Sequence, residues 1–127
     1  MMRTPPHSAD LERHVLGAMM LDQEALLTGI GLLKDSDFYE PRHNAIFLAL
    51  AGLSSAGTSC DLLSVSEALK ALKPPKNLDS LLMEISAEVV SAANLQDHAR
   101  QLRDLGLRRE AIAAAGREVV SDLEKAP

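Results

Sequence analysis

The chain has 127 residues, of which 46% are hydrophobic and 24% are charged, a balance typical of one globular domain. A formal net charge of −5 and only three aromatic side chains argue against a groove that follows nucleic-acid phosphates or stacks bases. The 22 Leu and 18 Ala residues far outnumber the β-branched and aromatic residues that favour strands. The composition therefore indicates an all-α domain.

The sequence also bears on location. No apolar run approaches the roughly 18–20 residues that a membrane span needs, and the first residues contain no apolar core of a secretory signal. The single cysteine, Cys60, cannot form an internal disulfide. We expect a cytoplasmic protein that does not contact membranes.

Residues 1–8 are expected to form a flexible arm, which precedes a helical globular subdomain over residues 9–90. A first helix is predicted over residues 9–21 and a second, capped by Asp22, over residues 22–33. Gly29 and Gly31 weaken the second helix and suggest close packing or a kink there.

A turn at residues 34–37 leads to a third helix over residues 41–56, which begins at Pro41 and ends before a glycine cap at Gly57. Ser64 and Glu67 have the spacing of a capping box, which predicts a fourth helix over Val65–Leu72. Two prolines end that helix, and a fifth is predicted over Leu78–Val89.

The last segment, residues 91–127, is the most informative. A helix from about Ser91 to Glu124 would be about 50 Å long, whereas a globule of the first 90 residues is only about 30 Å across. The helix must therefore project, or bend back at Gly106 or Gly116. The expected architecture is a compact bundle of about five short helices followed by one long C-terminal helix.

An apolar stripe continues to the end of this long helix, interrupted by Arg109 and Gly116. A projecting stripe should pair with another helix, either in a second copy or in a helix that follows in a longer parent chain. We favour this reading, a partial helical hairpin used for oligomerisation, over an ordinary last core helix. The predicted oligomer interface comprises Leu102, Leu105, Arg109, Ile112, Val119 and Leu123.

No residues form a convincing catalytic, cofactor or metal site. The sequence has no P-loop motif, and its four histidines lack the i, i+4 spacing of a helical zinc site. His43 is expected to pair with Glu40 or to cap a helix, and the aspartates at 35 and 37 are explained by turn chemistry. The arginines of the last helix alternate with acids, which favours salt bridges such as Asp104–Arg108 over a nucleic-acid patch.

A series of short motifs then points to a family. In chain order they are Val15-Leu16-Gly17 with Met20-Leu21-Asp22, Asp37-Phe38-Tyr39 with His43 and Ile46-Phe47, Gly57 with Asp61-Leu62, Ser91-Ala92-Ala93-Asn94, and Arg109-Glu110. Their order and spacing resemble the N-terminal domain of bacterial replicative DNA helicases of the DnaB type, over about residues 8–122. The sequence departs from the family pattern around Pro74-Pro75, and Val90 replaces a usual proline.

The resemblance implies a helical globule followed by the first arm of a helical hairpin. It also implies pairing into a dimer, assembly into the collar of a hexameric ring, and docking of the C-terminal helicase-binding domain of primase or of a helicase loader. In the parent helicase a separate motor domain would hold ATP and Mg²⁺, so this chain itself is not expected to be an enzyme or to need a cofactor. The alternative is a stand-alone adaptor that binds a helicase or primase by mimicking this collar.

Overall fold

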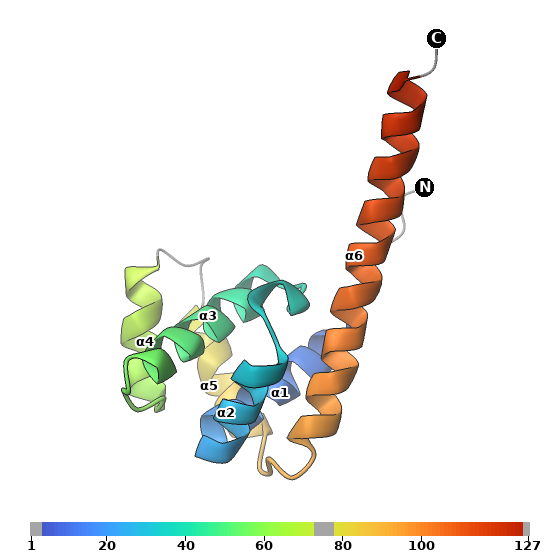
Figure 1. Cartoon of the computed structure of the whole chain (residues 1–127). Coiled ribbons are helices and arrows are strands. Elements are labelled where there is room, and N and C mark those ends of the chain that lie inside the picture. Colours follow the sequence, from blue (N-terminus) through green and yellow to red (C-terminus); the bar gives the residue numbers. More distant parts are fainter. Residues whose placement is uncertain (1–3, 73–77, 126–127) are drawn as a thin grey trace.

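In the computed structural model the chain folds into six α-helices and one short 3₁₀ helix, with no strand among the described residues (Figure 1). The structure describes residues 4–72 and 78–125, with side chains described as far as Arg117. The predicted all-α fold is confirmed, and no helix in the described part of the chain is long and apolar enough to cross a membrane. The helices are α1 (Ala9–Leu21), α2 (Gln23–Leu32), η1 (Asp35–Asp37), α3 (Pro41–Ser55), α4 (Leu62–Ala71), α5 (Leu78–Glu88) and α6 (Leu95–Lys125).

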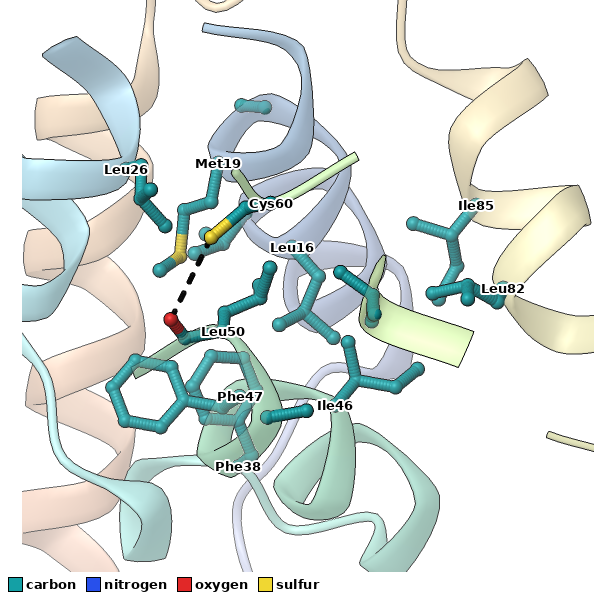
Figure 2. Packing of buried hydrophobic residues seen from close by; sticks show 14 of the residues in the cluster. Leu16, Met19, Leu26, Phe38, Ile46, Phe47, Leu50, Cys60, Leu82 and Ile85 are labelled. Carbon is teal, nitrogen blue, oxygen red and sulfur yellow. Dashed lines mark hydrogen bonds between the residues drawn. The ribbon is translucent and has the colours of Figure 1, made fainter. Parts of the chain in front are cut away.

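Helix α1 lies at the centre of the globule and contacts α2, α3, α5 and α6. Its apolar side is wholly buried at Val15 and Leu16. Gly17 allows Val89, just after α5, to lie directly against α1, because a Cβ at position 17 would stand 2.3 Å from Val89 Cγ2. Figure 2 shows how side chains from α1, α2, α3 and α5 meet around this helix. Burying a large aliphatic side chain contributes about 1.5–3 kcal/mol, so this core is the main source of stability.

Helix boundaries follow local capping chemistry. Ser8 Oγ accepts a hydrogen bond from the Leu11 amide at the start of α1. At the start of α2 the predicted cap Asp22 accepts a hydrogen bond from the Ala25 amide. Helix α3 begins at Pro41 and ends in a Schellman arrangement, in which Gly57 has φ +73° and the Thr58 amide donates to Leu53 O.

The predicted start of α4 was wrong. The helix begins at Leu62, and its N-cap is Asp61, whose carboxylate accepts a hydrogen bond from the Ser64 amide at 2.8 Å. Both Asp61 and Ser64 are of residue types that favour the N-cap position. With Asp61 as the cap, the helix begins at Leu62 and is about one turn longer than predicted. The helix ends at Ala71, and the residues around Pro74-Pro75 lie outside the described part of the chain.

The last helix begins at Leu95, later than the predicted Ser91, and then runs to Lys125 as one helix without bending back at Gly106 or Gly116. Its first turns pack on α1, α2 and η1, and its C-terminal half projects away from the globule (Figure 1). Of the two glycines in α2, only Gly29 meets a neighbour, since a Cβ there would lie 2.7 Å from Met19 Sδ. The division of the chain at residue 90 and the flexibility of residues 1–8 stay predictions.

Candidate interaction surface

Helix α6 changes from a core helix to an exposed helix within a few turns. Leu95, Ala99 and Leu102 are fully or almost fully buried against the globule. From Leu107 onward most of the described side chains are exposed, including Ile112 at 59%. Ile112 lies beyond these contacts with the globule, and an isoleucine left this open is a candidate for contact with a partner.

Polar contacts fasten α6 to η1 at the point where the helix leaves the globule. Arg103 Nη1 donates to Asp37 Oδ1 at 2.9 Å, and the Asp37 carboxylate is completely buried. Lys34 pairs with Glu110, which lowers the pKa of the Glu110 carboxyl below its ordinary value. Asp37 is therefore an internal ion-pair partner of α6, and not only a turn residue as predicted from the sequence.

Arg109, six residues after Arg103, continues the same attachment. Its guanidinium donates to Ser36 O, Asp37 O and Pro6 O, each at 2.9 Å. The guanidinium carbon also lies 5.6 Å from the centre of the Tyr39 ring. The other neighbour of Tyr39 is His7, whose ring stacks on the Tyr39 ring with the two ring centres 4.2 Å apart.

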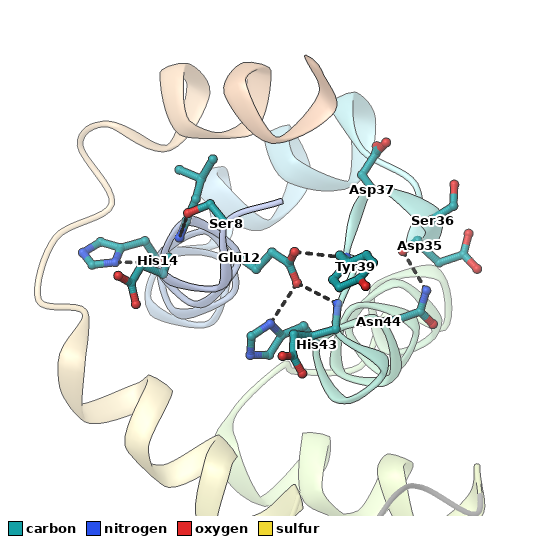
Figure 3. Close-up of polar contacts among 12 residues, drawn as sticks. Ser8, Glu12, His14, Asp35, Ser36, Asp37, Tyr39, His43 and Asn44 are labelled. Carbon is teal, nitrogen blue, oxygen red and sulfur yellow. Dashed lines mark hydrogen bonds and ion pairs between the residues drawn. The ribbon is translucent and has the colours of Figure 1, made fainter. Parts of the chain in front are cut away.

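A buried carboxylate supports this region from inside the globule. Glu12 is wholly buried, and it accepts hydrogen bonds from the Tyr39 and Glu40 amides at 3.0 and 3.2 Å (Figure 3). His43 Nδ1 lies 2.9 Å from the same carboxylate, so the predicted pairing of His43 with Glu40 was wrong. The partner is 31 residues away in sequence, on α1, and is not the N-cap residue of α3.

The six residues predicted for the oligomer interface do not share one environment. Leu102 is fully buried within its own chain and cannot lie on an oligomer interface, so this assignment was wrong. Arg109 is half-buried and already bonded to three carbonyls of its own chain. Leu105 is half-buried and Ile112 is exposed, whereas the side chains of Val119 and Leu123 lie outside the described residues.

Helix geometry explains this split. The stripe forms two rows, because a step of seven residues nearly completes two turns of an α-helix, whereas a step of three residues stops about 60° short of one turn. The row that begins with Leu102 and Arg109 starts against the globule, whereas the row that begins with Leu105 and Ile112 lies to one side of it. In the second row Leu105 is half-buried and Ile112 is exposed, and both stay predicted interface residues.

Leu105 lines an open groove of about 540 Å³ between the start of α1 and α6. Leu11 lies across the groove from α1, and Asp10, Asp104 and Arg108 also line it. His14 and His98, whose ring centres are 6.1 Å apart, separate this groove from a smaller hollow of about 240 Å³. The groove could not be predicted from the sequence, because its two walls are more than 80 residues apart and no local pattern joins them.

Among the residues that the structure describes, the remaining reactive side chains do not gather into a site. Cys60 is buried in the core (Figure 2), where its thiol points to Leu50 O, and burial raises the pKa of the thiol. No group of three His, Cys, Asp or Glu side chains in the described parts of the chain is placed to hold a metal ion.

An all-helical globule whose last helix projects from it defines the class of protein: a small helical domain with an extended arm. The DnaB-like helicase N terminal domain family matches residues 4–104, and the chain belongs to this family. The resemblance deduced from the sequence motifs is therefore confirmed.

Individual relatives agree with this assignment. The chain is 38% identical over 109 residues to the replicative DNA helicase DnaB of Rhodothermus marinus, covering 84% of this chain and 12% of that protein. It is 36% identical over 115 residues to DnaB of Treponema pallidum, covering 89% of this chain and 26% of that protein. The chain thus spans about a quarter or less of the length of these relatives.

The fold is also that of a solved domain. The crystal structure of the N-terminal domain of DnaB helicase from Mycobacterium tuberculosis matches with a TM-score of 0.87 and 26% sequence identity. The match covers 97% of this chain and 91% of that domain, so it includes the projecting part of α6, which lies beyond the residues that the family as a whole matches.

Proposed function

We propose that this chain serves DNA replication as the collar domain of a replicative helicase, where it self-associates through α6 and docks primase or a helicase loader. The observation that carries the proposal is the projecting second half of α6, on which Ile112 remains 59% exposed beyond the reach of the globule. The family assignment supports it, because the matched relatives are replicative helicases.

The action proposed for this chain is association without bond chemistry. Pairing of two α6 helices along the row of Leu105 and Ile112 would bury apolar side chains worth about 1.5–3 kcal/mol each. By the resemblance to replicative helicases, ATP and Mg²⁺ would be held by the motor domain of the proposed parent helicase, and the sequence of this chain contains no P-loop motif.

The test of self-association is the mass of the purified chain by light scattering across a concentration series. Ile112→Asp places a charge on the exposed face of α6 and should shift the chain towards monomer while its helical circular dichroism is retained. Leu63→Asp is the matched control, because Leu63 is 73% exposed on α4, away from α6, and should leave the mass unchanged. A mass that Ile112→Asp does not alter would remove Ile112 from the interface.

The docking proposal has a separate test. Calorimetric titration with the C-terminal helicase-binding domain of a bacterial primase should give saturable heat with the wild-type chain. If the primase domain gives no heat even at concentrations well above those at which it binds an assembled helicase, docking is contradicted. Self-association then remains as the proposed function of the chain.

A further inference from the structure

The attachment around Arg109 does more than close the surface of the globule. Arg109 bonds Pro6 O, which lies 103 residues away in sequence, together with Ser36 O and Asp37 O of η1. A guanidinium presents its five N–H donors in a fixed plane, so three carbonyls around one such group hold it in one orientation. One side chain of α6 thus connects two otherwise separate segments.

The N-terminal segment contributes its own contacts to this junction. Ser8 fixes one end by capping α1, and the His7 ring stacks on Tyr39, against which Arg109 also lies. Tyr39 is held in turn through its amide, which donates to the buried Glu12. Residues 6–8 therefore run from the start of α1 across to α6, as a strap with a defined contact at each residue.

The position of the junction along α6 gives it leverage. Gly106 and Arg103 contact η1 in the two turns before it, whereas residues 111–117 are almost all exposed. The helix continues for 16 residues after Arg109, about 24 Å at 1.5 Å per residue. A rotation of about 10° at this point would move the far end of the helix by about 4 Å.

We propose that Arg109, Tyr39 and the strap of residues 6–8 form a latch that sets the direction in which α6 leaves the globule. Arg109 is then a positioning residue for association rather than a member of the apolar interface. The inference rests on the proposed function for its consequence, because a fixed direction of α6 would determine which geometry of pairing two copies can adopt. The latch itself is a property of one molecule.

The test measures the direction of α6 within a single chain. Spin labels are placed at Glu67→Cys on α4 and Ala115→Cys on α6, both exposed positions, in a Cys60→Ala background. The labelled chain is diluted with excess unlabelled chain, so that only intramolecular distances are read by pulsed electron paramagnetic resonance. Arg109→Ala should broaden the distance distribution.

Arg108→Ala is the matched control, because it removes the same charge from the next residue and breaks only the exposed pair with Asp104. This variant should keep the wild-type distribution. Hydrogen exchange gives a second reading, in which Arg109→Ala should raise exchange of the amides in residues 103–110 by about tenfold and Arg108→Ala should not.

A chain that begins at Ser8, and the variant His7→Ala, keep the folded core whole and test the strap directly. Both should broaden the distance distribution, as Arg109→Ala does. Distance distributions like that of the wild type in both the shortened chain and Arg109→Ala would overturn the proposal. If Arg109→Ala fails to fold, the shortened chain and His7→Ala test the proposal in its place. A wild-type chain that proves monomeric would contradict the proposed function but would leave this reading of the latch intact.

Discussion

Gly106 of α6 lies directly against Asp37 of η1, so closely that a Cβ at position 106 would stand 2.2 Å from Asp37 Oδ1 and 3.2 Å from its Cα. The same Asp37 oxygen accepts a hydrogen bond from Arg103. The absence of a side chain at 106 therefore allows a buried carboxylate to lie between the helix backbone and the guanidinium one turn earlier. This packing decides how closely α6 approaches the globule.

Gly106→Ala should lower the free energy of unfolding, although alanine favours a helix by about 1 kcal/mol over glycine. The added methyl group must displace the buried Asp37 carboxylate and strain its ion pair, and we expect a net loss of about 1–3 kcal/mol. Gly116→Ala is the control on the same helix, because a Cβ there meets nothing within 4 Å. Chemical denaturation should show Gly116→Ala to be neutral or more stable, and an equal gain in both variants would disprove the steric constraint.

Glu12→Gln should reveal how much the buried carboxylate supports the connection between η1 and α3. The carboxylate accepts from two backbone amides and also contacts His43, whereas an amide side chain offers one carbonyl oxygen and must place its own N–H donors in the same space. We expect a loss of about 1–3 kcal/mol in urea denaturation. Glu24→Gln, at an exposed position of α2, should change stability by less than about 0.5 kcal/mol.

Sequence reasoning succeeded where the signal is local. The apolar period placed α1 correctly, Pro41 marked the start of α3, and Gly57 marked its end, because each depends on residues within a few positions. The comparison of helix length with globule size also predicted that α6 either projects or bends back, and Figure 1 shows that it projects. These features need no knowledge of which helices meet.

The errors arose where distant segments decide the outcome. His43 pairs with Glu12 rather than with Glu40 because α1 and α3 pack together, and nothing in the sequence near His43 indicates this. Leu102 matches the spacing of the exposed stripe, yet the globule covers it. The three carbonyls around Arg109 belong to residues far from α6 in sequence, and a sequence does not show which backbone carbonyls will accept a hydrogen bond.

Asp61 should make the stability of α4 depend on pH. The hydrogen bond from the Ser64 amide is the main cause that lowers the pKa of the Asp61 carboxyl below its ordinary value of 3.8. A carboxyl with a lower pKa in the folded state stabilises the fold above its unfolded pKa, and this contribution is lost as the pH falls through the folded pKa.

The measurement compares thermal midpoints of the wild type and Asp61→Asn as the pH falls from about 7 to below about 3. The wild-type advantage should be present near neutral pH and should vanish in acid, because asparagine caps a helix without titrating. Ser64→Ala tests the cap that the sequence suggested. It keeps the bond from the Ser64 amide and removes only the smaller contribution of the Ser64 hydroxyl to the lowered pKa of Asp61, so it should reduce the pH-dependent advantage less than Asp61→Asn does. An advantage that persists in acid would show that the carboxylate charge does not contribute.

Single-stranded DNA should bind this chain weakly, with a dissociation constant above about 100 µM near physiological salt. Arg103 donates a hydrogen bond to Asp37, and Arg109 donates to backbone carbonyls. Arg108 pairs with Asp104 at 2.9 Å, so all three guanidinium groups already have anionic or carbonyl partners. The net charge of −5 adds a repulsive field. Fluorescence anisotropy with a labelled oligonucleotide checks this. Micromolar affinity that falls steeply with added salt would mean that DNA phosphates displace these internal partners, and Arg109→Ala would then weaken DNA binding as well as loosen α6.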